Sequence, residues 1–201
     1  TMSDGTQLWL YVEGGAGAHS GVCEILRLAG DVLSQELDSF SPSPGACAVR
    51  DVNGDGANEV VRNATDPYVF CYACGVREPS FSILRRDGTA MVAVEPQPLA
   101  ADAPADVSTL NDRMLEQANA GLWKDALATM DEIISLNPQA AAGDIAQWNI
   151  AWVRVNGEAR RVQAESQGGA YLLLDQVFYG DFATAVDAVR DSFAAQGIAV
   201  F

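Results

Sequence analysis

The chain lacks most of the residues on which catalytic and nucleic-acid-binding sites are usually built. His19 is the only histidine among 201 residues, which excludes a metal site made of several histidines. A Ser–His–Asp triad would depend on that one side chain, in a glycine-rich loop beside Ser20. Basic residues number 12 against 27 acidic ones. The net charge of -15 repels phosphate backbones, so we expect no nucleic-acid partner. Because catalytic residue types are scarce, we also expect no enzymatic activity.

Long hydrophobic runs are also lacking. No stretch reaches the roughly 18 apolar residues that a membrane-spanning helix needs, so we expect no transmembrane segment. The printed sequence shows no signal-peptide pattern, and we expect its first five residues, Thr1-Met2-Ser3-Asp4-Gly5, to be a trimmed start, at which a removed signal peptide would leave no trace. The sequence does not indicate an oligomeric state.

The four cysteines all lie in the first half of the chain. An even number in a β-rich region is typical of two disulfides and an oxidising compartment, which predicts an exported protein that is periplasmic, cell-surface or extracellular. Three pairings are possible, and Cys23–Cys47 with Cys71–Cys74 is favoured. A four-cysteine zinc site is the alternative, but it usually needs two CxxC pairs and this chain has one. A turn follows that pair, which disfavours a thioredoxin-like redox motif.

A proline-rich segment divides the chain into two halves of different pattern. Residues 96–106 contain three prolines and few large apolar side chains, so they predict a semi-extended linker. Apolar residues alternate with period two before it and recur at helical spacing after it. The sequence therefore predicts an α+β chain of two segregated domains, an all-β domain over 1–95 and an all-α domain over 107–201.

The first half contains a weak internal repeat. Residues 25–33 resemble residues 83–91, and both stretches predict a hairpin with a tight glycine turn. An apolar strand is expected upstream of each copy, at residues 8–12 and 68–72. Such repeated hairpins predict a domain that is either propeller-blade-like or a sandwich.

The second half predicts a series of amphipathic helices. The first two are expected at residues 107–120 and 122–136. A third runs from a cap at Asp144 to a break at Asn156-Gly157, and a shorter helix follows at 158–166. The last two are expected at 170–179 and from Gly180-Asp181 to about residue 195.

The most specific motif lies between two expected strands, residues 46–50 and 59–62. Oxygen-bearing side chains occupy alternate positions of one loop, which is how proteins surround the hard ion Ca²⁺ with oxygen ligands. Gly56 permits the backbone turn, and the Ala57 carbonyl would contribute a further oxygen. The predicted calcium ligands are Asp51, Asn53, Asp55, Ala57 and Glu59.

The loop differs from an EF-hand, because Arg62 occupies the position of the bidentate glutamate and a strand follows in place of a helix. Asp51-Val-Asn-Gly-Asp-Gly-Ala-Asn-Glu-Val-Val61 is instead similar to the calcium loops of FG-GAP and VCBS repeats. That resemblance covers about 11 residues and implies one bound Ca²⁺. A propeller needs several such loops and about 400 residues, so the resemblance does not extend to a whole propeller.

A second resemblance concerns the helical half. Gly121-Leu-Trp-Lys-Asp-Ala126-Leu127, through to Asn137-Pro138, looks like the second helix of a tetratricopeptide (TPR) repeat, with Ala126 as the small residue at the helix contact. Gly180-Asp-Phe-Ala-Thr-Ala185-Val186 repeats that opening after 59 residues, where the family spacing would be 34 or 68. The resemblance implies a TPR-like array that binds a protein or peptide; the alternative is a generic helix bundle.

Together these patterns predict a calcium-stabilised, non-catalytic protein that mediates protein or glycan interactions at the bacterial cell envelope. Two alternatives stay open. One is a hydrolase, or an accessory domain of a secreted enzyme, that uses acidic residues. The other is a structural subunit of an envelope assembly.

Overall fold

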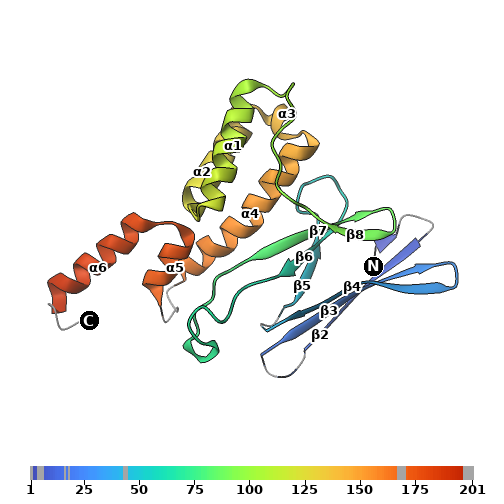
Figure 1. Ribbon diagram of the computed structural model, residues 1–201, viewed down its shortest axis with the longest axis horizontal. Helices are drawn as coiled ribbons and strands as arrows, with labels where there is room; N and C mark the ends of the chain where they lie inside the picture. Colours follow the sequence, from blue (N-terminus) through green and yellow to red (C-terminus); the bar gives the residue numbers. More distant parts are fainter. Residues whose placement is uncertain are drawn as a thin grey trace. The chain divides into compact units, whose positions relative to one another are not determined.

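The computed structural model describes residues 2–3, 7–15, 17, 19–42, 45–166 and 171–196. The chain divides into two compact units (Figure 1). The β unit comprises Thr1–Pro67 and Pro79–Glu95, and the helical unit comprises Tyr68–Glu78 and Pro96–Phe201. The segment Tyr68–Glu78 therefore belongs to the helical unit although it lies, in sequence, between two strands of the β unit.

The described residues of the β unit form two antiparallel sheets of four strands each. In both sheets the strands follow one another in chain order, as a meander. The first sheet consists of β1 (Met2–Ser3), β2 (Gln7–Gly15), β3 (Gly21–Ala29) and β4 (Val32–Ser41). The second consists of β5 (Cys47–Arg50), β6 (Glu59–Asn63), β7 (Phe81–Asp87) and β8 (Ala90–Ala93).

The two repeated hairpins predicted from the sequence are confirmed. They are the pairs β3–β4 and β7–β8. Their turns contain Gly30 at φ 61° and Gly88 at φ 58°, a left-handed conformation that glycine adopts without steric cost. The expected strand at residues 8–12 lies within β2.

The strand expected at residues 68–72 is wrong. This part of the chain bends and then forms the short 3₁₀ helix η1 (Tyr72–Cys74). The reason is the disulfide between Cys71 and Cys74, whose Cα atoms are 5.2 Å apart. Residues three apart in an extended strand would be separated by about 10 Å, so this bond requires a turn.

One hydrophobic core contains residues from both sheets. Trp9, Cys23 and Ile25 come from the first sheet and are fully buried. Their spacing follows the alternation of side chains in a strand, which places them on one face. Ala46, Cys47, Val60 and Leu84 complete this core from the second sheet and the chain leading into it. The β half is thus a pair of antiparallel sheets packed face to face.

The described part of the helical unit contains six α-helices besides η1. Their bounds are α1 Ala105–Asn119, α2 Trp123–Leu136, α3 Pro138–Ala141, α4 Asp144–Glu165, α5 Leu172–Tyr179 and α6 Phe182–Gln196. In Figure 1, α1 and α2 lie side by side next to α4, whereas α6 follows α5 at the other end of the unit. None of the described helices is long and apolar enough to cross a membrane.

The predicted break at Asn156-Gly157 is wrong, because α4 runs without interruption for 22 residues. Gly157 lies at a close helix contact: a Cβ atom there would be 2.8 Å from Leu127 Cγ of α2. Asn156 directs its side-chain amide to the Trp152 carbonyl of its own helix, at 3.1 Å. Gly143, not Asp144, is the N-cap residue of α4.

Part of the segment expected to act as a linker lies along α4. The Gln97 N–H donates to Asn149 Oδ1 at 3.0 Å, and Asn149 Nδ2 donates to the Gln97 carbonyl at 2.6 Å. Leu99 packs against the core of the helical unit. Helix α1 then begins at Ala105.

Candidate functional site

The predicted calcium loop connects β5 to β6. Both strands form as expected, and their pairing places Arg50 directly opposite Glu59 at the base of the loop. Gly54 and Gly56 have φ values of 82° and 87°, so the backbone turns twice through a conformation that favours glycine. These strands and glycines bring the predicted side chains into one short loop.

Asp51 organises the backbone of this loop. Its two carboxylate oxygens accept hydrogen bonds from the N–H groups of Gly54, at 2.7 Å, and Gly56, at 2.9 Å. These backbone donors lower the pKa of the Asp51 carboxyl group. Asp51 is therefore ionised at neutral pH and positioned at the start of the loop.

Asn53 and Asp55 contact each other. Asn53 Nδ2 donates to Asp55 Oδ2 at 2.9 Å, and the Asp55 N–H donates to Asn53 Oδ1 at 3.1 Å. The second Asp55 oxygen, Oδ1, accepts from the N–H of Ala57 at 2.7 Å. Both side chains are exposed or half-buried, so solvent and small ions have access to their oxygen atoms.

Glu59 is the buried carboxylate of the loop, with 2% of its surface exposed. Its Oε2 accepts a hydrogen bond from the Val52 N–H at 3.0 Å. Burial raises the pKa of Glu59, and the charges of Asp55 and Asp51 raise it further. Among the residues that the structure describes, no basic side chain pairs with this carboxylate.

The donor set fits calcium in its chemistry, because the loop supplies carboxylate and amide oxygens and no nitrogen or sulfur ligand. The side chains are nevertheless engaged with one another and with the backbone. Within the described ranges, no three histidine, cysteine, aspartate or glutamate side chains lie close enough together to hold a metal ion. The loop thus brings the predicted residues together in sequence and space without forming a finished cage.

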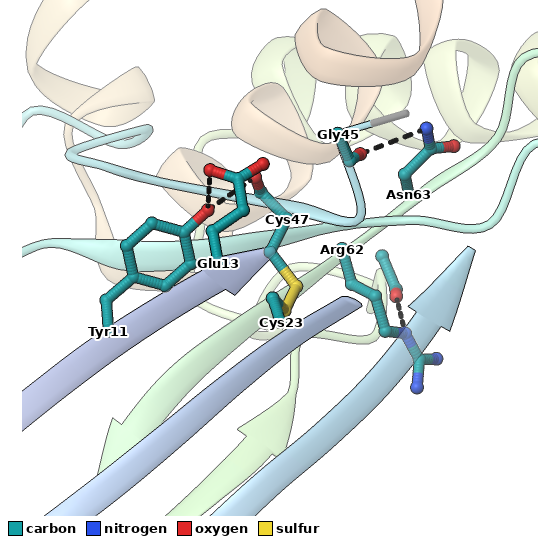
Figure 2. The surroundings of a disulfide bond; sticks show 8 residues. Tyr11, Glu13, Cys23, Gly45, Cys47, Arg62 and Asn63 are labelled. Atoms are coloured by element: carbon teal, nitrogen blue, oxygen red, sulfur yellow. Dashed lines mark hydrogen bonds between the residues drawn. A yellow bond between two sulfur atoms is a disulfide. The ribbon is translucent and has the colours of Figure 1, made fainter. Parts of the chain in front are cut away.

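Both disulfides are present in the structure, in the pairing favoured from the sequence, and no described cysteine is free. Figure 2 shows the bond between Cys23 of β3 and Cys47 of β5, which links the two sheets. Beside it, the Tyr11 hydroxyl lies 2.8 Å from Glu13 Oε2 and 2.9 Å from the Cys47 carbonyl oxygen. Burial, with a contribution from Glu13, raises the pKa of Tyr11 to about 12, so this hydroxyl acts as a structural donor.

Two more polar contacts surround the same disulfide. Asn63 Nδ2 donates to the Gly45 carbonyl at 3.2 Å, and Arg62 Nε donates to Ser82 Oγ at 3.0 Å. These contacts join β6 to the chain before β5 and to β7. This region of the β unit is therefore fixed by a covalent bond and by side-chain hydrogen bonds.

The two tryptophans of α4 have different partners. Trp148 Nε1 donates to Asp144 Oδ1 at 3.0 Å within α4. Trp152 instead lies against Trp123 of α2, with ring centroids 5.4 Å apart. His19 is exposed in the connection between β2 and β3.

Arg160 is a feature that sequence reasoning missed. Its guanidinium carbon lies 4.3 Å from the centroid of Trp123, and Nη1 donates to the Asn156 carbonyl at 3.1 Å. Burial lowers the pKa of Arg160 to about 10, against an opposing effect of Glu78. Its Nε is buried with no hydrogen-bond partner among the described atoms. The sequence signal that could have found this contact is the i, i+4 spacing of Asn156 and Arg160, which places both residues on one face of a helix.

The two similar segments that begin at Gly121 and Gly180 lie next to each other in the helical unit. Gly121 and Gly180 have φ values of 78° and 80°, and a Cβ atom on Gly180 would be 2.7 Å from the Gly121 carbonyl oxygen. Lys124 Nζ lies 2.8 Å from Asp181 Oδ2. The N-terminal ends of α2 and α6 therefore meet at two glycine turns.

Comparisons with protein-family models, with curated proteins and with solved structures found no match to this chain.

Proposed function

We propose that this chain is an exported, non-catalytic protein whose loop between β5 and β6 binds one Ca²⁺. In this proposal the ion stabilises the β unit, and the protein mediates protein or glycan interactions at the bacterial cell envelope. The observation that carries the proposal is Glu59, a buried carboxylate with two neighbouring aspartate charges and no basic partner among the described residues. A divalent cation would supply the missing positive charge.

The ligands would be the side chains of Asp51, Asn53, Asp55 and Glu59, with the Ala57 carbonyl. Bound Ca²⁺ would contribute electrostatic stabilisation only. To ligate it, Asn53 and Asp55 would exchange their mutual hydrogen bond for contacts with the ion. The position of the loop between two antiparallel strands fits the resemblance to FG-GAP and VCBS loops, since an EF-hand loop is flanked by helices.

The two disulfides support the proposed location. Such bonds form and persist in oxidising compartments and are rare in a reducing cytosol. Cys23–Cys47 is buried between the sheets, so it is part of the folded core. An exported protein also meets the millimolar calcium concentrations that weak extracellular calcium modules require.

The helical unit is proposed to be a TPR-like array that binds a protein or peptide. The meeting of the two similar glycine turns supports a repeated helical unit. Helices α5 and α6 leave several large apolar side chains more than one-third exposed: Leu172, Leu173, Val177, Phe182, Val186 and Phe193. Exposed apolar side chains on neighbouring helices are typical of interaction surfaces.

The experiment is a calcium titration of the full chain by calorimetry, paired with thermal unfolding. Because the loop has no terminal bidentate glutamate, we expect a dissociation constant on the order of 10⁻⁴ M or somewhat tighter. Binding to the folded state then adds about 1.4 kcal/mol of stability at ten times that concentration.

Asp55→Ala should abolish the calcium-dependent rise in melting temperature. The matched control is Asp112→Ala, which removes an exposed carboxylate of α1 and should leave the response intact. The proposal fails if no heat of binding is detected up to millimolar calcium, or if the Asp55 variant responds as the parent does.

A further inference from the structure

The first sheet has two apolar faces, of which only one contributes to the core. Trp9, Cys23 and Ile25 lie on the inner face. The strand register places the alternate residues on the other side. There, three leucines from neighbouring strands form one row and two more form the next: Leu8, Leu28 and Leu33, then Leu10 and Leu26. We call this side the outer apolar face.

Solvent reaches the whole outer apolar face. None of its described side chains is buried. On the inner face of β2 to β4, by contrast, six residues are buried: Trp9, Gly21, Cys23, Ile25, Ser39 and Ser41. Val12 is 48% exposed, Leu33 57% and Phe40 61%. A row of leucines on an exposed sheet face is unusual for an isolated sheet, because one apolar face is enough to build the core. The face therefore has the composition of an interface.

A pair of carboxylates sits on the same face. Glu24 of β3 lies directly opposite Asp38 of β4, and like charges in that position destabilise a sheet unless a cation or basic group approaches them. The strands' own arginine cannot do so, because Arg27 lies on the inner face and pairs with Glu36 at 2.8 Å. No basic side chain lies on the outer face among the described residues of β2 to β4.

This charge pattern selects among possible occupants. A second copy of the chain would bring two carboxylate pairs together between molecules that each carry a net charge of -15. An anionic lipid surface would be repelled in the same way. A helix with an apolar stripe flanked by lysine or arginine would place apolar side chains on the leucine rows and a cation at Glu24 and Asp38.

We propose that the outer apolar face binds a basic amphipathic helix of a partner protein. The helix would cover the sheet as helices cover sheets in layered folds. This binding does not depend on calcium or on the loop between β5 and β6, so either proposal can fail without the other.

The test measures binding of a fluorescent 14-residue probe peptide to the full chain at physiological salt. The probe contains only leucine and lysine, with leucines at helical spacing. A scrambled peptide of the same composition and a version with glutamate in place of lysine are the controls. We expect the probe to bind and both control peptides to bind at least tenfold more weakly.

Variants then locate the site. Leu33→Ser with Phe40→Ser should weaken binding of the probe at least tenfold, and so should Glu24→Gln with Asp38→Asn. The matched control is Asp112→Asn with Glu116→Gln, which also removes two exposed carboxylates, from α1, and should leave binding unchanged. Val12→Lys adds a cation in the row of Glu24 and Asp38 and should abolish binding of the basic probe. This variant tests the same face independently, in case the serine variant does not fold.

Three results would overturn the proposal. The first is a scrambled peptide that binds as tightly as the probe. The second is equal weakening by the carboxylate variants of α1 and of the sheet, which would show only attraction to an acidic chain. The third is a dimer in sedimentation that Leu33→Ser with Phe40→Ser converts to a monomer, because the face would then be covered by a second copy.

Discussion

Asn149 holds both backbone polar groups of Gln97. Its side-chain amide accepts from the Gln97 N–H at 3.0 Å and donates to the Gln97 carbonyl at 2.6 Å, as a neighbouring strand would do. The same Nδ2 lies 2.8 Å from Asn111 Oδ1 of α1, and Asn149 itself is fully buried. One side chain of α4 thus connects the segment after residue 95 to the first helix.

Replacing this amide should destabilise the helical unit. Asn149→Ala removes both hydrogen bonds to Gln97 and leaves the buried Asn111 side chain without this partner, and one unsatisfied buried group costs about 1–3 kcal/mol. We expect a loss of about 1–3 kcal/mol in the free energy of unfolding, measured with urea. Asn119→Ala, at an exposed position of α1, should change it by less than about 0.5 kcal/mol. Equal effects of the two variants would contradict the role assigned to Asn149.

A methyl group at residue 157 should also destabilise the helical unit. In an exposed helix interior, Gly→Ala stabilises by about 1 kcal/mol, but here the new Cβ atom would meet Leu127 at 2.8 Å. We expect Gly157→Ala to reduce the free energy of unfolding by about 1–3 kcal/mol. In a Leu127→Ala background the same change should cost less or become stabilising, since the obstructing atoms are gone. Additive effects in this double-mutant cycle would rule out the contact.

The two disulfides should differ in their contributions to stability. Cys23–Cys47 closes a loop with a sequence separation of 24, and Cys71–Cys74 one with a separation of 3. The loop-entropy relation gives about 3.5 kcal/mol for the first and about 2 kcal/mol for the second. Cys23→Ala with Cys47→Ala should therefore lower the melting temperature more than Cys71→Ala with Cys74→Ala. The reverse order would contradict this expectation.

Acid should remove the stability that the ionised Glu36 side chain of β4 contributes to the first sheet. The hydrogen bond from Ser34 lowers the pKa of Glu36, and Arg27 at 2.8 Å lowers it further, although burial opposes both. Because the folded-state pKa is lower than the unfolded one, this contribution is present above the ordinary glutamate pKa and is lost as the pH falls through the folded value.

Glu36→Gln should thus be less stable than the parent at pH 7, by on the order of 1 kcal/mol at most. The difference between the two proteins in denaturant titrations should shrink as the pH falls through the lowered folded-state pKa of Glu36, because both side chains are then neutral. A difference that does not change as the pH falls from 7 into the acid range would show that Glu36 acts through packing instead of charge.

Local patterns predicted most elements of the chain. The hairpins β3–β4 and β7–β8 follow from alternation and a glycine turn, and α1, α2, α5 and α6 follow from helical spacing and breakers. The strands on either side of Asp51–Glu59 follow in the same way. The composition of the loop was thus predictable, but the contact between Asn53 and Asp55 depends on side-chain rotamers, which sequence spacing does not specify.

The wrong predictions have tertiary contacts as their cause. Gly157 was interpreted as a helix breaker, although its role is to let Leu127 approach. Residues 68–72 have the alternation of a strand, but the nearby disulfide imposes a turn. The outer apolar face could not be predicted from the sequence, because only the strand register shows which apolar residues of β2, β3 and β4 lie on the same side.

The insertion of Tyr68–Glu78 in the helical unit has a consequence during synthesis. Gln163 Nε2 donates to the Arg77 carbonyl at 2.8 Å across 86 residues of sequence. At roughly 5–20 residues per second on the ribosome, about 4–17 seconds would pass between synthesis of Arg77 and synthesis of Gln163, its hydrogen-bond donor. Throughout that interval β7 and β8 can complete the second sheet, so the nascent chain must carry this segment as an open loop until α4 emerges.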